Sequence, residues 1–206
     1  MKTQRSDGSK ESIMGKVSVT NNVSLDGVMQ APGRPDEDTR GGFDRGGWAV
    51  PYTDPVMAGA MAEGMSRPGV LLLGRRTYED FAGYWPQQKD NPYTEVLDNT
   101  WKYVASNTLT EPLPWKNSTL LTGDAADAVA ELKNQPGPDI AILGSGELIQ
   151  SLRRRNLIDE YVLLIYPLIL GAGRRLFPDG APPSGLRLTN SLTTTTGVVI
   201  ATYQTA

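Results

Sequence analysis

The sequence predicts a single α/β domain with a central, mostly parallel β-sheet flanked by helices. Short apolar runs typical of buried strands alternate with stretches of helical spacing, and several of these runs end in glycine just before a helix start. After Leu186 the pattern changes to closely spaced strands without helices between them, which predicts an antiparallel hairpin at one end of the sheet. A length of 206 residues suits one domain.

The first half of the chain supplies two strands, two helices and a long loop. Residues 16–21 alternate polar and apolar side chains, which is typical of a strand. The glycine- and proline-rich stretch 30–47 is a candidate lid, because long loops within compact domains are often functional. Thr53 or Asp54 can cap a helix that starts at Pro55 and runs to about residue 65. After a buried strand at 70–73, Thr77-x-x-Asp80 resembles a capping box that opens a short helix.

The second half repeats the alternation and then ends in strands alone. Helical spacing predicts one helix at 124–134 and another after Gly144-Ser145-Gly146. The predicted strands of this half are 101–105, 119–121, 140–143, 161–165, 186–190, 191–196 and 198–204.

Composition and charge exclude several classes of function. A net charge of −3 gives no electrostatic case for a nucleic-acid partner. No apolar run approaches the roughly 20 residues that span a bilayer, so no membrane segment is expected. Residues 1–13 are mostly polar and are interpreted as a disordered leader or tag remnant before a domain over 14–206, with a cytoplasmic location as the default.

The chain contains neither cysteine nor histidine. Disulfides, thiolate nucleophiles, Ser-His-Asp hydrolysis, and metal sites built on cysteine or histidine are therefore excluded, and no metal is expected. A proton donor in this chain must be a carboxylate, lysine, tyrosine or bound water. Hydride chemistry is compatible with this restriction, because a cofactor supplies the reactive atom and the protein mainly positions it.

Two glycine-bearing turns are candidates for holding phosphate. In the first, Gly74-Arg75-Arg76-Thr77, backbone N–H groups at a helix start favour anions and the guanidinium groups can grip phosphate bidentately. One of these arginines could bind the 2′-phosphate that distinguishes NADP from NAD. The alternative is a surface turn with two solvated arginines, which this motif alone favours.

The second turn is Gly144-Ser145-Gly146-Glu147-Leu148. Two glycines at a helix N-terminus can wrap a pyrophosphate. The alternative is a tight turn capped by Ser145. Since the third glycine of the dinucleotide fingerprint is replaced by Ile149, a standard Rossmann domain is disfavoured.

Four motifs in order resemble the dihydrofolate reductase-like superfamily. They are Ser24-Leu25-Asp26-Gly27, Leu73-Gly74-Arg75-Arg76-Thr77-Tyr78-Glu79, Ile142-Leu143-Gly144-Ser145-Gly146-Glu147-Leu148 and Pro167-Leu168-Ile169-Leu170-Gly171-Ala172-Gly173. The last motif resembles the C-terminal reductase domain of the bacterial riboflavin-biosynthesis deaminase–reductase (RibD type), and still more its stand-alone relatives. The similarity covers about residues 15–204.

The resemblance implies a dihydrofolate reductase-like fold with NADPH across the strand ends. Gly74, Arg75, Arg76 and Thr77 would hold cofactor phosphates, and Ser106 and Asn107 would contact the adenosine end. Gly144, Ser145, Gly146, Glu147 and Leu148 would take the pyrophosphate. Family members usually join two glycines by a cis peptide here, so the serine leaves a cis bond between Gly144 and Ser145 open.

The substrate side has four candidate residues. By position, the resemblance gives Asp26 a role in orienting substrate or nicotinamide, and Asp54 a role in protonating or anchoring a pterin-like ring. The alternatives are an aspartate that tightens the Asp26-Gly27 turn and a plain helix N-cap before Pro55. Trp48 and Tyr52 could stack on a flat heterocycle, with core or lid packing as the alternative.

The expected activity is hydride transfer from NADPH to a C=N or C=O bond of a small heterocyclic substrate, either pterin-like or ribosylamino-pyrimidine-like. Dihydrofolate reduction itself is less expected, since the first and last motifs favour the riboflavin-type branch. The alternative from another class is a non-catalytic NADP(H)-binding module that kept the fold and lost turnover. The resemblance also implies a homodimer.

Overall fold

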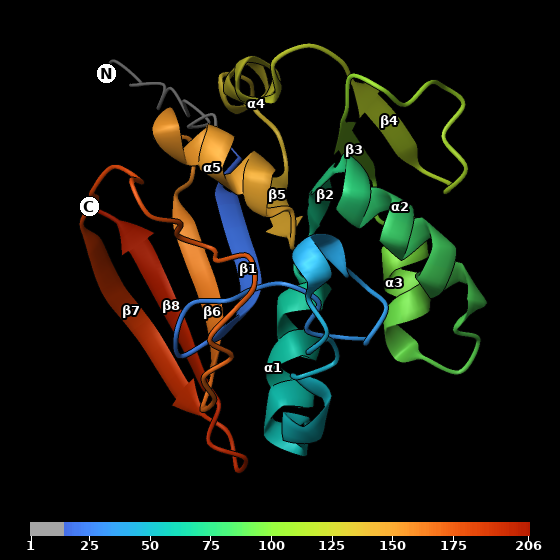
Figure 1. The fold of residues 1–206 in the computed structure, drawn as a ribbon. Helices are drawn as coiled ribbons and strands as arrows, with labels where there is room; N and C mark the ends of the chain where they lie inside the picture. The colour runs from blue at the N-terminus through green and yellow to red at the C-terminus, as the bar shows by residue number, and fades with distance from the viewer. Residues whose placement is uncertain (1–14) are drawn as a thin grey trace, which may run out of the picture.

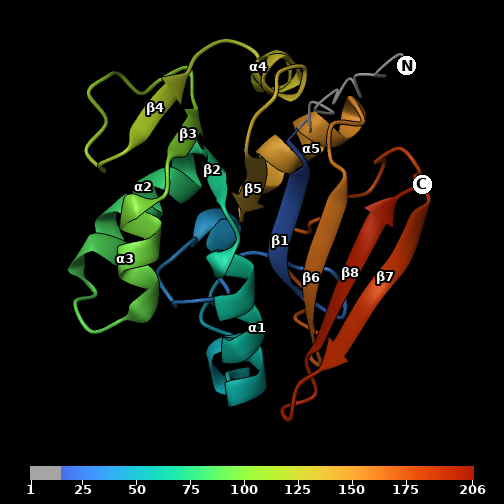
Figure 2. The same cartoon turned by 180° about the vertical axis from the view of Figure 1, so that it is seen from behind.

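One eight-stranded sheet runs through the molecule (Figures 1 and 2). This computed structural model describes residues 15–206; residues 1–14, which hold the predicted leader, lie outside the described part. The strands are β1 (Val17–Ser24), β2 (Gly69–Gly74), β3 (Lys102–Ala105), β4 (Ser118–Leu121), β5 (Asp139–Leu143), β6 (Glu160–Tyr166), β7 (Leu186–Thr193) and β8 (Val199–Thr205). Their order in the sheet is β4-β3-β2-β5-β1-β6-β8-β7.

The strand directions confirm the predicted mixed sheet. Strands β1 to β6 pair in parallel, β8 lies antiparallel to β6, and β7 lies antiparallel to β8. The parallel strands therefore end at one common edge, where ligands bind in open α/β sheets. That edge carries the turns after β2, β3 and β5.

Five α-helices cover the two faces of the sheet. They are α1 (Pro55–Ser66), α2 (Arg75–Tyr84), α3 (Pro92–Asn99), α4 (Ala125–Lys133) and α5 (Gly146–Arg154). Helices α4 and α5 bury Val129, Ile149 and Leu152 against the odd-numbered face of β1. On the opposite face the apolar residues form two separate clusters, one containing Met57 of α1 and the other Tyr78 of α2 with Leu97 of α3.

The centre of that opposite face is polar. In β1, Val17, Val19 and Val23 belong to the cluster under α4 and α5, whereas the alternate residues Thr20 and Asn22 belong to neither cluster on the other face. Thr20 and Asn22 instead line a cleft. The polar–apolar alternation of the first strand thus builds a core on one side and a cleft floor on the other.

Three local expectations are wrong. The capping box at Thr77 does not open a helix, because α2 already begins at Arg75 after Gly74, and the Thr77 hydroxyl bonds to Ser145 instead. The predicted strands 186–190 and 191–196 form a single strand, β7, with a bulge near residue 189, followed by a turn. Helix α3, capped by Asn91, was not predicted; its eight residues are too few for a clear helical period.

In residues 15–206, no helix has both the length and the apolar character needed to cross a membrane. Within the same residues, no cluster of acidic side chains is arranged to hold a metal ion.

Candidate active site

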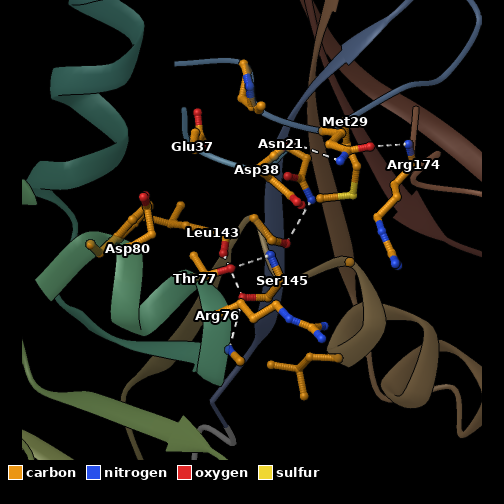
Figure 3. Close-up of a pocket in the computed structure, with 18 of the residues that line it drawn as sticks. Asn21, Met29, Glu37, Asp38, Arg76, Thr77, Asp80, Leu143, Ser145 and Arg174 are labelled. Carbon is orange, nitrogen blue, oxygen red and sulfur yellow. Dashed lines mark hydrogen bonds between the residues drawn. The ribbon is translucent and has the colours of Figure 1, made fainter. Parts of the chain in front are cut away.

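The two glycine-bearing turns meet at the carboxyl edge of the sheet (Figure 3). The Gly74 amide donates to Ser145 Oγ over 3.0 Å, and the Ser145 amide donates to Thr77 Oγ1 over 3.1 Å. The Ser145 hydroxyl in turn donates to the Leu143 carbonyl, 3.0 Å away. The first two bonds join the turn after β2 to the turn after β5, as the dinucleotide hypothesis requires, and the third fixes the Ser145 hydroxyl within its own turn. We call these three bonds the clasp.

The backbone of the second turn depends on its residue types. Gly144 and Ser145 both have φ of 58°, in the left-handed region. A Cβ on Gly144 would lie 3.2 Å from the Thr77 methyl carbon, so only glycine lets the two turns approach this closely. Left-handed backbone costs a serine roughly 1–2 kcal/mol, which the three bonds of the clasp offset. The Gly144–Ser145 bond is trans, and the Ser145 side chain does not cap α5.

A large cleft opens at this clasp, with a volume of about 1570 Å³. All the residues predicted to bind cofactor line it: Gly74, Arg75, Arg76, Thr77, Ser106, Asn107, Gly144, Ser145, Gly146, Glu147 and Leu148. Ser106 and Asn107 also fix their own loop, since Ser106 Oγ accepts from the Leu109 amide and Asn107 Oδ1 from the Gly123 amide. The structure therefore gathers eleven residues from three turns on one wall.

The start of α5 presents free donors to this cleft. Within the described residues, the amides of Gly146, Glu147 and Leu148 make no hydrogen bond to the protein, and the first helical bond is from Ile149 to the Ser145 carbonyl at 3.0 Å. Three free N–H groups and the positive end of a helix dipole together suit a diphosphate.

The basic residues that line the cleft are all arginines: Arg34, Arg40, Arg75, Arg76, Arg174 and Arg175. Arg75 pairs with Glu79 on the same helix at 3.0 Å. Arg40, Arg76 and Arg174 converge on one carboxylate oxygen, Oε1 of Glu147, at 3.8, 3.4 and 3.2 Å. Because the Glu147 side chain is 73% exposed, these ion pairs are weak enough for a phosphate to displace them.

The long loop 30–47 lies along the cleft and is held at several points. Arg34 pairs with Asp80 of α2, and its guanidinium carbon lies 4.4 Å from the centre of the Tyr84 ring. Gln30 is buried; its side-chain amide donates to the Asp38 and Arg40 carbonyls. This loop therefore lines part of the cleft and is fixed to α2, and its role as a lid stays a prediction.

Comparisons with known proteins agree with this geometry. The family model of the RibD C-terminal domain matches residues 15–200. This chain belongs to the RibD C-terminal domain family. The protein YyaP of Bacillus subtilis (strain 168) is 30% identical over 187 residues, which cover 88% of this chain and 90% of that protein.

Solved structures extend the likeness. A protein from Shewanella sp. PV-4, named for riboflavin biosynthesis, shares 27% identity with a TM-score of 0.69 over 93% of this chain and 99% of its own. The deaminase/reductase of Thermotoga maritima matches at 12% identity and a TM-score of 0.62, and this chain spans 57% of it. Dihydrofolate reductase of Enterococcus faecalis shares the fold at 12% identity and a TM-score of 0.58, over 94% of this chain and 98% of its own.

In this RibD C-terminal domain, Asp26 acts as a clamp outside the cleft lining. Its carboxylate accepts from the Ser24 hydroxyl at 2.6 Å and from the Leu170 and Gly171 amides at 3.0 and 2.8 Å. Although burial acts to raise the pKa of Asp26, these hydrogen bonds outweigh it and hold the pKa at about 2. Such a carboxylate does not donate a proton at neutral pH. Its hydrogen bonds tie the turn after β1 to Leu170 and Gly171, and a role in orienting substrate or nicotinamide stays a prediction.

The clamp predicts a loss of stability in acid. Because the pKa of Asp26 is lower in the fold than its ordinary 3.8, its contribution is complete above about pH 4 and is lost as the pH falls toward 2. We expect Asp26→Asn to flatten this part of the stability–pH curve, measured by urea unfolding at pH 2.5 to 6. An unchanged curve in the variant would show that the clamp contributes nothing.

Asp54 caps helix α1 and is buried. One carboxylate oxygen accepts from the Met57 amide at 2.7 Å, and the other accepts from the Thr195 hydroxyl and amide at 2.5 and 2.6 Å. The Thr195 hydroxyl bond is the largest cause of its lowered pKa. Asp54 does not line the cleft, so the structure supports the N-cap interpretation rather than a proton-donating one.

The aromatic candidates Trp48 and Tyr52 pack rather than face the cleft. Both lie edge-on to Tyr166, with ring centroids 5.1 and 5.6 Å apart. Tyr166 itself lines the cleft and donates its hydroxyl to Asn22 Oδ1 at 2.8 Å. Burial raises the pKa of Tyr166 to about 12, so it stays protonated as a hydrogen-bond donor.

One part of the cleft wall is largely apolar. It comes from the turn before α1, from α1, from the second half of α2 with the residue after it, and from α3. Its side chains are Val50, Met61, Met65, Phe81, Tyr84, Trp85, Tyr93 and Leu97. This wall suits a flat, weakly polar molecule, in contrast to the arginine-rich wall at the clasp.

Several lining residues were not predicted from the sequence: Gln30, Arg34, Glu37, Arg40, Tyr166 and Arg174. Four of them lie in the loop 30–47, whose density of charge was a usable signal. Arg174 directly follows the Gly171-Ala172-Gly173 motif, and its amide donates to Gln30 Oε1 at 2.9 Å, a contact that only the folded chain reveals.

Proposed function

We propose that the protein is an NADPH-dependent reductase that transfers hydride to a C=N or C=O bond of a small heterocycle, either pterin-like or ribosylamino-pyrimidine-like. The observation that carries the proposal is the clasp between Ser145, Gly74 and Thr77, which sets the two candidate phosphate-binding turns side by side at the cleft. The family is reductase-like, and the E. faecalis dihydrofolate reductase that shares the fold was solved with NADP(H).

The residues present fit this cofactor. The free amides of Gly146, Glu147 and Leu148 would hold the diphosphate, and Arg75 and Arg76 would hold the 2′-phosphate. Ser106 and Asn107 would contact the adenosine end. When bound, NADPH supplies the hydride; the protein orients it and, through the loop 30–47, excludes water.

The apolar wall would hold the substrate. Its methionines and aromatic rings offer contact to both faces of a flat ring, while Asn22 and Tyr166 on the cleft floor offer hydrogen bonds to its edge. Dihydrofolate and 5-amino-6-(5-phosphoribosylamino)uracil represent the two substrate types. Homodimer formation and a cytoplasmic location stay predictions.

Calorimetry with NADPH and NADH, followed by an NADPH-oxidation assay on both substrate types and related heterocycles, tests the proposal. We expect binding that favours NADPH, and turnover of at least one heterocycle. Absence of NADPH binding would refute the proposal. Tight binding without turnover on any heterocycle would instead support the non-catalytic module.

A further inference from the structure

The proposed reduction of a C=N bond needs a group that donates a proton. Reduction of a C=N bond adds a hydride to carbon and a proton to nitrogen. The chain has no histidine. The carboxylates of Asp26 and Asp54 each accept three hydrogen bonds from the protein, and neither residue lines the cleft. A carboxyl group that lines the cleft is the strongest acid that remains, because burial raises the pKa of the Tyr166 phenol to about 12.

Most acids that line the cleft are already engaged or fully solvated. Asp38 forms an ion pair with Arg40, Asp80 with Arg34, Glu79 with Arg75, and Glu147 with three arginines. Asp124 caps helix α4, and Asp36 and Asp179 are exposed. Glu37 is different: within residues 15–206 it is half-buried and forms no ion pair.

The loop 30–47 holds Glu37 by one carboxylate oxygen and leaves the other oxygen free. Its Oε2 accepts from the Gly33 amide at 2.6 Å and from the Arg34 amide at 3.1 Å, whereas Oε1 has no partner in the described chain. A Cβ on residue 33 would lie 3.1 Å from Oε2, so glycine at this position lets the Glu37 carboxylate approach the backbone closely. Figure 3 shows Glu37 among the residues that line the pocket.

The surroundings of Glu37 favour its protonated form. Burial is the largest cause of its raised pKa, and the negative charge of Asp80 on α2 acts in the same direction. The Gly33 and Arg34 amides and the Arg34 guanidinium oppose the shift without cancelling it. Two further acids of the loop flank Glu37 in the sequence: Asp36, whose side chain is 85% exposed, and Asp38, which pairs with Arg40.

We propose that Glu37 is the acid of this cleft, and that its free oxygen Oε1 exchanges a proton with a ring nitrogen of the bound heterocycle. Glu37 and Tyr84 of the apolar wall line the same cleft, and Arg34 links the two, since its amide donates to Glu37 and its guanidinium lies over the Tyr84 ring. The hydride adds to the carbon of the C=N bond, the Glu37 O–H bond breaks, and its proton goes to the nitrogen. The two electrons come from NADPH, leaving NADP⁺, and solvent returns the proton to Glu37.

The inference rests on the proposed function, and a probe that needs no turnover tests it. 2,4-Diaminoquinazoline is a flat weak base whose ring nitrogen and amino group pair with a carboxyl group. Its binding is followed by tryptophan fluorescence, since Trp85 lines the cleft, and by calorimetry in buffers of different ionisation enthalpy. In Glu37→Gln the remaining oxygen still accepts from the Gly33 and Arg34 amides, so the loop geometry is kept.

We expect Glu37→Gln to raise the Kd of the probe by about tenfold or more and to abolish the proton exchange seen with the wild type. Glu37→Asp keeps the carboxyl group on a shorter side chain. Its Kd for the probe should lie between those of the wild type and Glu37→Gln. Asp44→Asn is the matched control, because Asp44 lies in the same loop, is 89% exposed and does not line the cleft. Its Kd should match the wild type.

Equal Kd values for the wild type and Glu37→Gln, an equal loss in Asp44→Asn, or no binding of the probe to the wild type would each overturn the assignment. Melting curves of all variants check that they fold. Titration with NADPH is independent of this measurement: if NADPH fails to bind while the probe still depends on Glu37, the reductase proposal falls and the acid site stands.

Discussion

Replacing both Arg75 and Arg76 by alanine is expected to weaken NADPH binding by about tenfold to a hundredfold while leaving NADH binding nearly unchanged. The two side chains sit at the start of α2, on the cleft wall next to the clasp. Their present partners, Glu79 and Glu147, are exposed carboxylates at 3.0 and 3.4 Å. Exposed pairs of this kind contribute about 0–1 kcal/mol, so little is lost when a phosphate takes their place.

The size of the effect follows from the charge of the 2′-phosphate. A hydrogen bond to a charged group contributes about 1.5–3 kcal/mol, and each 1.4 kcal/mol is about tenfold in affinity. NADH lacks this phosphate, so its affinity should depend on the amides of α5 instead. Calorimetric titration of both cofactors measures the two Kd values directly.

The double variant Arg154→Ala/Arg155→Ala is a control for charge. It also removes two adjacent arginines, but at the opposite end of α5 and away from the cleft lining. Its affinity for both cofactors should stay within about twofold of the wild type at 0.15 M salt, where distant charges are screened. Equal losses of NADPH and NADH affinity in Arg75→Ala/Arg76→Ala would refute the specificity role of the pair.

Lys102→Met is expected to lower the free energy of unfolding by about 2 kcal/mol without changing cofactor affinity. Lys102 is completely buried at the start of β3. Its ammonium donates to the Leu97 and Thr100 carbonyls, both at 2.6 Å, and lies 4.3 Å from the centre of the Trp115 ring. It therefore satisfies the Leu97 carbonyl in the last turn of α3 and the carbonyl of the C-cap residue Thr100, both of which methionine would leave without this donor.

The ionisation of Lys102 gives this prediction a pH dependence. Burial is the main reason that the pKa falls from 10.5 to about 8, and the charge of Asp98 opposes the fall. The pKa of Lys102 is about 8 in the folded chain and 10.5 in the unfolded chain. Between these values the unfolded chain binds more protons than the folded chain, so Lys102 makes the free energy of unfolding rise with pH. The stability difference between the wild type and Lys102→Met should therefore widen from about pH 8 to pH 10.

Thermal unfolding followed by circular dichroism measures both effects. For a domain of this size a loss of about 2 kcal/mol corresponds to a fall in Tm of about 4–8 °C. The control is Lys116→Met, because the Lys116 side chain is 56% exposed and should cost less than about 0.5 kcal/mol. A Tm for Lys102→Met equal to that of the control would contradict the capping role.

The sequence was sufficient to predict the sheet and the meeting of the two glycine-bearing turns, because both depend on local signals. Apolar runs ending in glycine located β2 and β5, and the glycine turns after them contain the residues that meet in the clasp. The carboxyl ends of parallel strands lie at one edge of the sheet, so the turns that follow β2 and β5 must both lie at that edge.

The substrate side could not be predicted, because its residues are selected by contacts between distant segments. Asp54 has the sequence context of a helix cap and also of a substrate acid; only its bonds to Thr195, 141 residues away, assign it to the cap. Glu37 carries no distinguishing mark among the neighbouring acids Asp36 and Asp38. The partial burial of its side chain follows only from the fold, in which the loop lies against α2.

A crystal structure of the complex with NADP⁺ tests the central claim most directly. The account predicts the diphosphate within hydrogen-bonding distance of the Gly146, Glu147 and Leu148 amides, the 2′-phosphate against Arg75 or Arg76, and the nicotinamide directed toward the apolar wall. A dinucleotide bound elsewhere, or bound with its diphosphate away from the start of α5, would contradict it.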